Sequence, residues 1–189
     1  MFTDLIDYGY LGIRNGIYDF DMNKVAECDK DDWFEIYNIN NKTYFVNNYK
    51  RIERYFKDEK HNSIAVYDDK FNLLFSNLED FKYFENNKLI AMTDKDSTKL
   101  YDEKFHMLKD LKTKIYIIYN YIDKYYAFTN TSVDRYGIVD RDGNICVSGL
   151  KNISQLADDY FVYQNGFKYG IMDYEGNEIV SFSIFDSWK

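Results

Sequence analysis

The sequence of 189 residues has no proline, two histidines and two cysteines. Cys28 and Cys146 are too few for a disulfide scaffold or a four-cysteine zinc site, and such low cysteine content favours a reducing compartment. With only His61 and His106, no histidine-based metal cluster is expected. No apolar run is long enough to cross a bilayer, and the first residues lack the pattern of a signal peptide. We therefore expect a soluble, cytoplasmic protein.

Basic residues are outnumbered, with 24 Lys and Arg against 32 Asp and Glu and a formal net charge of -8. Nucleic-acid affinity depends on clustered Lys and Arg, so the composition argues against direct binding to nucleic acid. A negative protein is instead attracted to a basic surface on another protein. The alternative is that the acidic residues only keep the chain soluble.

The usual signatures of catalysis are also missing. The sequence contains no glycine-rich phosphate loop, no paired-histidine metal motif and no nucleophile elbow. The segment 140–144 looks like the start of a calcium loop, but it fails the spacing test. With Gly143 as the turn glycine, the first ligand position falls on Ile138 and the distal glutamate position on Gly149. We expect neither a cofactor nor a metal, and we do not expect an enzyme.

What the sequence does contain is a repeat. Residues 136–144 and 169–177 are copies of each other, and three weaker copies occupy residues 15–23, 64–72 and 98–106. Two apolar or aromatic residues precede an aspartate in each copy, and Asn, or once His106, follows four positions later. The aspartates are Asp19, Asp68, Asp102, Asp140 and Asp173, separated by steps of 49, 34, 38 and 33 residues. The repeating unit is therefore about 35 to 40 residues long.

Each copy is interpreted as a hairpin that turns at its aspartate, whose side chain can accept a hydrogen bond from the backbone N–H two residues later. Gly143 and Gly176 supply the positive φ that a tight turn needs. Met22, Phe71 and Phe105 stand in that place in the other copies, which predicts a wider or differently bulged turn there.

Asparagine pairs predict further turns. Asn165 with Gly166 lies between two strand-like runs, and Asn40–Asn41 and Asn86–Asn87 are expected to turn two more hairpins.

A whole unit is predicted to be a four-stranded meander, clearest at residues 114–119, 124–129, 135–140 and 144–148. Several strands are apolar on both faces, which is typical of stacked blades or solenoid coils. We predict an all-β fold of about five β-meander units in a single domain, 1–189. The units form a small β-propeller-like ring whose two chain ends share a blade, or else an open β-solenoid. Helical spacing at 52–56 and 150–156 allows one or two short helices at most.

The segment Tyr136–Asn144 resembles the WG-repeat family, whose units read aromatic, glycine, two hydrophobic residues, aspartate, two variable residues and glycine. The resemblance is clear over residues 135–180 and weak elsewhere. Tyrosine stands where the family usually has tryptophan, and three of the five copies lack one or both glycines. The resemblance implies a β-rich repeat with a binding or scaffolding role, and it brings no catalytic residue.

The residues expected to contact a partner are acidic or aromatic residues in predicted loops and strand ends. They are Asp29, Asp31, Asp32, Tyr116, Tyr119, Tyr121, Tyr125, Tyr126, Asp158 and Asp159. The five repeat aspartates are interpreted as independent turn caps. The alternative is that they gather at one end of a closed ring to hold a cation or a basic side chain.

Three functional hypotheses follow. The first is a non-enzymatic protein-binding module, such as an acidic inhibitor that blocks a basic surface of a partner enzyme: an immunity protein or a phage anti-defence protein. The second is a propeller that binds or sequesters a small ligand such as a nucleotide, although five arginines offer little for phosphate. The third is a hydrolase with paired carboxylates such as Asp140 and Asp173.

Overall fold

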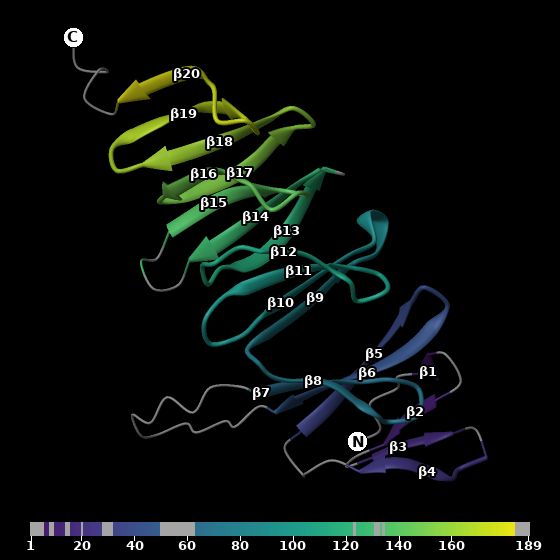
Figure 1. Ribbon diagram of the computed structural model, residues 1–189. Coiled ribbons are helices and arrows are strands. Elements are labelled where there is room, and N and C mark those ends of the chain that lie inside the picture. The colour runs from purple at the N-terminus through teal and green to yellow at the C-terminus, as the bar shows by residue number, and fades with distance from the viewer. Residues whose placement is uncertain are drawn as a thin grey trace, which may run out of the picture. The chain divides into compact units, whose positions relative to one another are not determined.

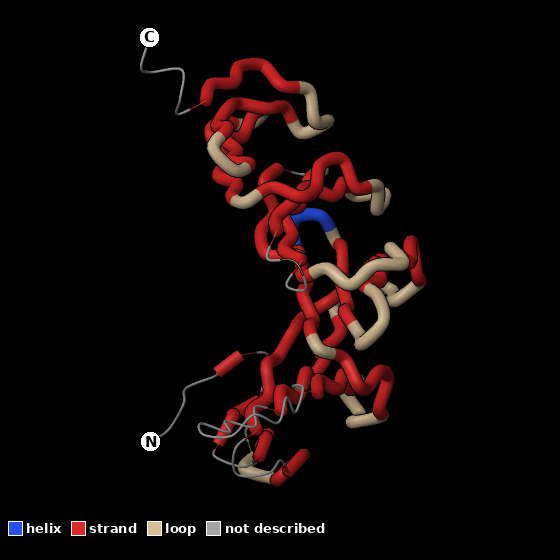
Figure 2. Tube along the Cα trace, turned by 90° about the vertical axis from the view of Figure 1, so that its left-hand side faces the viewer, coloured by secondary structure: helices blue, strands red, loops and turns tan. Residues whose placement is uncertain are grey.

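The computed structural model describes residues 6–7, 10–13, 16–19, 21–27, 32–49, 63–122, 124–130, 133 and 135–183. These residues form five four-stranded antiparallel sheets, each in chain order. The only helical element within them is the 3₁₀ turn η1 (Glu85–Asn87), and strands make up most of the trace (Figure 2). The predicted all-β fold of five meander units is confirmed.

The chain divides into two compact units, Met1–Phe81 and Lys82–Lys189. The first sheet consists of β1 (Ile6–Asp7), β2 (Tyr10–Ile13), β3 (Gly16–Asp19) and β4 (Lys24–Glu27). The second sheet consists of β5 (Asp32–Ile39), β6 (Lys42–Tyr49), β7 (Ser63–Tyr67) and β8 (Leu73–Leu78).

The next strand, β9, spans the boundary between the units. The third sheet consists of β9 (Asp80–Phe84), β10 (Leu89–Thr93), β11 (Thr98–Asp102) and β12 (Met107–Asp110). The fourth consists of β13 (Tyr116–Ile122), β14 (Tyr125–Asn130), β15 (Arg135–Asp140) and β16 (Ile145–Leu150). The last consists of β17 (Asn152–Ala157), β18 (Tyr160–Asn165), β19 (Lys168–Asp173) and β20 (Glu178–Ser183) (Figure 1).

Two details of the predicted fold are wrong. The described strands near both chain ends belong to separate sheets of four consecutive strands, so the two ends do not share a blade. The helical spacing at residues 150–156 also misleads, because Leu150 ends β16 and Ile153 and Leu156 lie in β17. The other helical spacing, at 52–56, falls outside the described residues.

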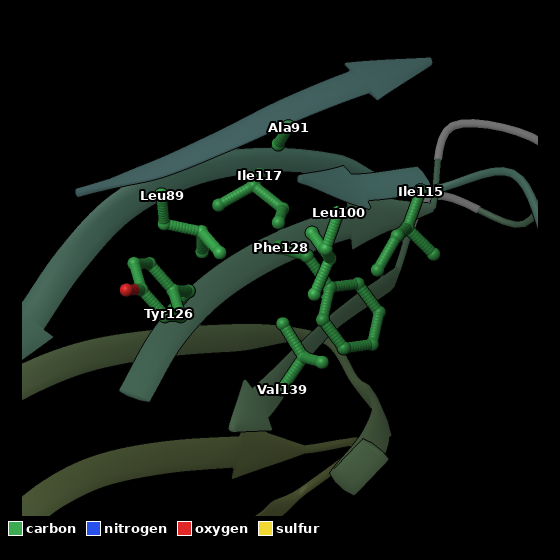
Figure 3. Close-up of a cluster of buried hydrophobic side chains, with 8 residues drawn as sticks. All are labelled: Leu89, Ala91, Leu100, Ile115, Ile117, Tyr126, Phe128 and Val139. Atoms are coloured by element: carbon green, nitrogen blue, oxygen red, sulfur yellow. The ribbon is translucent and has the colours of Figure 1, made fainter. Parts of the chain in front are cut away.

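In the second unit, the third, fourth and last sheets pack face to face in chain order. One apolar cluster joins the third sheet to the fourth, and it includes Leu89, Leu100, Ile117 and Tyr126, whose side chains converge between the sheets (Figure 3). A second cluster joins the fourth sheet to the last. The fourth sheet is thus apolar on both faces, as the sequence predicts, because it is covered on both.

All five repeat hairpins have the same turn. The aspartate N–H donates to the carbonyl of the residue four positions later, and its own carbonyl accepts from the N–H three positions later. The residue before the Asn or His has positive φ in every copy, which is a type I turn followed by a glycine-type bulge. The prediction of a different turn without glycine is wrong: the φ values are 63° at Met22, 58° at Phe71, 62° at Phe105, 79° at Gly143 and 96° at Gly176.

The asparagine pairs also turn the chain. Asn40 and Asn41, with φ of 53° and 59°, form a two-residue hairpin loop between the paired Ile39 and Lys42. The Asn86–Asn87 pair lies in η1. Asn165 is paired to Lys168, so the third predicted turn is made by Gly166 and the residue after it.

Candidate interaction surface

The repeat aspartates satisfy their own turns. In the second copy, the Asp68 carboxylate accepts from the backbone N–H of Asn72 at 2.8 Å and from its side-chain amide at 2.8 Å. The first, fourth and fifth copies have the same pair of bonds, and the third has His106 Nδ1 in place of the amide. The amide hydrogen bond lowers the pKa of Asp19 and of Asp68, because it favours the ionised carboxylate.

This geometry supports the interpretation of these aspartates as turn caps. Among the described residues, no group of three or more His, Cys, Asp and Glu side chains could hold a metal ion.

One end of the last sheet is strongly acidic. Pairing of Tyr160 with Asp173 places the β17–β18 turn and the β19–β20 turn at the same end. These two turns, residues 157–160 and 173–177, contain four carboxylates and no lysine or arginine. We call them the acidic end: Asp158, Asp159, Asp173 and Glu175. The corresponding turns of the fourth sheet carry two cations, Lys124 and Arg141, beside the pair Tyr125–Asp140.

A tyrosine of the fourth sheet fixes the acidic end in place. Tyr125 donates its hydroxyl hydrogen to Glu175 at 2.5 Å, and its ring stacks on Tyr174 with centroids 5.1 Å apart. The hydrogen bond to Glu175 raises the pKa of Tyr125 to about 12. Tyr125, predicted as a partner contact, therefore joins two neighbouring sheets.

The last sheet has an apolar outer face. We call it the terminal face and define it by Tyr160, Val162, Ile171, Ile179, Val180 and Phe182. The register aligns Val162, Ile171 and Val180 across three strands. Val180 is 50% exposed and Phe182 57%, and the Phe182 ring stacks on Tyr169 at 6.1 Å. Exposed apolar side chains gathered in this way are typical of interaction sites.

The same positions are covered in the two preceding sheets. Val162 and Ile171 correspond to Ala127 and Ile138, which are fully buried in the cluster against the last sheet. In the third sheet the corresponding residues are Ala91 and Leu100, which are buried against the fourth sheet. The terminal face is thus a sheet-packing face with no following sheet among the described residues.

The other predicted contact residues are dispersed. Asp158 and Asp159 are exposed at the acidic end, as the sequence interpretation requires. Tyr126 is fully buried, and its hydroxyl oxygen accepts from the Asn87 amide at 2.7 Å, which removes it from any surface. Tyr116 is half-buried beneath the Lys114 ammonium, 5.8 Å from the ring centroid.

Five predicted residues have no described side chain. Tyr119 and Tyr121 lie in β13, and Asp32 begins β5. Asp29 and Asp31 fall outside the described residues.

The terminal face was missed by sequence reasoning. The signal was present, because the strand 160–163 is apolar at four successive positions and β20 is apolar at Ile179, Val180 and Phe182. Aligning the copies would have shown that the last one repeats the apolar positions that packing covers in the copies before it.

No known family model and no curated protein matches the sequence. Solved structures do match. A eukaryotic initiation factor structure covers 93% of this chain and 51% of its own, with 11% identity and a TM-score of 0.50. A mitotic checkpoint complex structure covers 92% and 61%, with 8% identity and a TM-score of 0.46, and Hsv2 of Kluyveromyces lactis covers 94% and 61%, with 13% identity and a TM-score of 0.42.

The chain is therefore a β-propeller-like repeat protein. It spans about half the length of the initiation factor chain that it matches. No helix among the described residues is long and apolar enough to cross a membrane.

Proposed function

We propose that this chain is a non-enzymatic, cytoplasmic protein-binding module that binds a partner with a basic surface through the acidic end of its last sheet. The observation that carries the proposal is the concentration of four carboxylates, without a cation, in two adjacent turns. Asp158, Asp159 and Glu175 are exposed there. Opposite charge on a partner would speed encounter and fix orientation.

The rigidity of the acidic end supports this role. Glu175 is held by Tyr125, and Asp173 is held by the two bonds from Asn177, at 2.7 and 2.8 Å. Carboxylates that are already positioned lose little conformational entropy when a partner binds. We also propose that the repeat is of the WG type, since its second glycine closes the turn in the two copies that have it.

An inhibitor is the form of this function that the chain suits best. A small acidic module can cover the basic surface of an enzyme, as an immunity protein covers a toxin or a phage anti-defence protein covers a defence enzyme. The test is whether the captured partner is an enzyme that loses activity at one equivalent of this chain.

The binding itself is tested by capture from the source cells, followed by affinity measurement with the purified partner. We expect a stoichiometric basic protein, whose affinity falls as salt is raised from about 0.05 to about 0.5 M, because ions screen exposed charges. The triple variant Asp158→Asn, Asp159→Asn, Glu175→Gln should lose most of the binding.

Asp96→Asn is the matched control. Asp96 is an exposed acid in the β10–β11 turn, at the end of the third sheet opposite to its repeat turn. Equal binding by the triple variant and the wild type, or an affinity that salt does not change, would count against the proposal.

A further inference from the structure

The terminal face has the composition of an internal face. In a stack of repeats, the outer face of a terminal repeat is polar when it meets only water. Here Ile179 is 53% exposed, Val180 50% and Phe182 57%. Phe182 is paired with Tyr169 as Leu150 is paired with Tyr136 in the fourth sheet. Leu150 is buried in the cluster against the last sheet, so Phe182 is an apolar residue at a position that a following sheet covers in its predecessor.

The kind of contact that would cover this face already exists within the chain, where the fourth sheet covers the third and the last covers the fourth. The last sheet places Phe161 and Tyr163 against Ala127 and Ile138 of the fourth sheet. Its turn at Gly176 lies against the start of β16, where an added Cβ would be 3.2 Å from Val147 Cγ2. Since the terminal face repeats the residues that receive this contact, it is shaped to receive a sheet.

The charge at the aspartate end of each sheet indicates whether a second copy of this chain or a different protein covers the terminal face. In a second copy of this chain the first sheet is the candidate to cover the terminal face, and the segments 7–10 and 19–23 at its aspartate end contain three acids and no lysine or arginine. Packed in the same register, it would bring these acids to the acidic end. In the fourth sheet, which packs against the last sheet, the segments 122–125 and 140–144 at this end contain two cations, Lys124 and Arg141, beside three acids.

We infer that the partner covers the terminal face with a β-sheet of its own, and that lysine or arginine residues at the end of that sheet meet the acidic end. This inference rests on the proposed function, and it names the part of the partner that binds. The apolar rows supply the buried area, while the carboxylates set the register and exclude acidic sheets.

Photo-crosslinking of the full chain tests the inference. The probe is the purified captured protein, and p-benzoylphenylalanine replaces Phe182 in one sample and Met107 in another. Met107 is 58% exposed on β12, which makes it a control of equal exposure away from the terminal face. We expect the label at 182 to react with a β-strand of the partner that ends at lysine or arginine, and the label at 107 not to react.

Substitution gives a second measurement. Val180→Asp should weaken the partner's affinity at least about tenfold, as loss of a buried contact does, while Met107→Asp should leave it unchanged. Phe182→Ser removes apolar area without adding charge. It replaces Val180→Asp in the affinity measurement if Val180→Asp lowers the melting temperature.

The outcomes separate the inference from the proposed function. If the neutralised acidic end loses binding while both terminal-face variants keep it, the function stands and the inference falls. Crosslinks from position 182 to a loop or helix of the partner, or to a second copy of this chain, also overturn the inference. If neither the acidic end nor the terminal face matters for capture, both are wrong.

Discussion

The fourth and fifth copies contain both motif glycines, and the second and third contain neither. The two pairs of copies differ in the cross-strand neighbour of the first glycine position, which lies three residues before the repeat aspartate. Gly137 and Gly170 are paired with aromatic residues, Phe128 and Tyr163. A Cβ at Gly137 would overlap the Phe128 ring and the Val147 carbonyl oxygen, and one at Gly170 would overlap the Val180 carbonyl oxygen and approach the Tyr163 ring. The first glycine is therefore required by its cross-strand neighbour.

The second and third copies have no such neighbour. Ala65 is paired with Asn47, and Lys99 is paired with Met92. Neither partner is an aromatic ring, so a side chain is accommodated at the glycine position. The second and third copies thus lack the first glycine where its cross-strand neighbour is not aromatic, and they keep the same hairpin turn.

Of the substitutions that test this comparison, Gly137→Ala should change the free energy of unfolding most. We expect it to lower the free energy of unfolding by about 3 kcal/mol, because backbone and ring must both move to admit the methyl group. Ala65→Gly is the matched change in the second copy and should cost about 1 kcal/mol through backbone entropy. Urea unfolding measures both, and equal losses would show that the aromatic neighbour does not matter.

Gly143→Ala should have the next largest effect. Gly143 has φ of 79°, and an added Cβ would lie 2.6 Å from Lys109 Cγ in β12 and 2.9 Å from Cδ2 of Leu111, just after β12. We expect a loss of about 2 kcal/mol from backbone strain and crowding together.

Gly166→Ala measures the backbone strain without the crowding. Gly166 also has positive φ, but nothing lies within 4 Å of the position of an added Cβ. It should cost about 1 kcal/mol. If the two glycine variants lose the same free energy, contact between the turn and the preceding sheet adds nothing.

Much of this fold could be predicted from sequence, because the repeat and its aspartate turn are local patterns. The meander boundaries at 114–148 agree with the structure, since each strand is bounded by its own turn residues. The turn at Met22 could not be predicted, because propensity alone disfavours positive φ at that residue, and the pair of bonds from Asn23 to Asp19 overrides it. The apolar strands of the terminal face are visible in the sequence, but their exposure is not, since it depends on which sheets pack against each other.

Met22→Gly should stabilise the protein. Met22 has φ of 63° and is 57% exposed, so glycine relieves backbone strain and gives up little packing. We expect a gain of up to about 1 kcal/mol. Phe71→Gly is the contrasting change, and it should destabilise the protein because the Phe71 ring stacks on Phe45 with centroids 4.4 Å apart. The melting temperatures of the two variants should shift in opposite directions, and a common direction would contradict this account of the turns.

His106→Asn should have the smallest effect. His106 Nδ1 lies 3.0 Å from the Asp102 carboxylate and takes the place of the Asn amide found in the other four copies. Because the amide can donate the same hydrogen bond to Asp102, the free energy of unfolding should change by no more than about 0.5 kcal/mol. His106→Ala keeps the backbone bond but removes the side-chain donor, and it should cost about 1 kcal/mol. Urea unfolding at pH 7 distinguishes the two variants, and a loss for His106→Asn as large as that for His106→Ala would mean that the third turn depends on the imidazole itself.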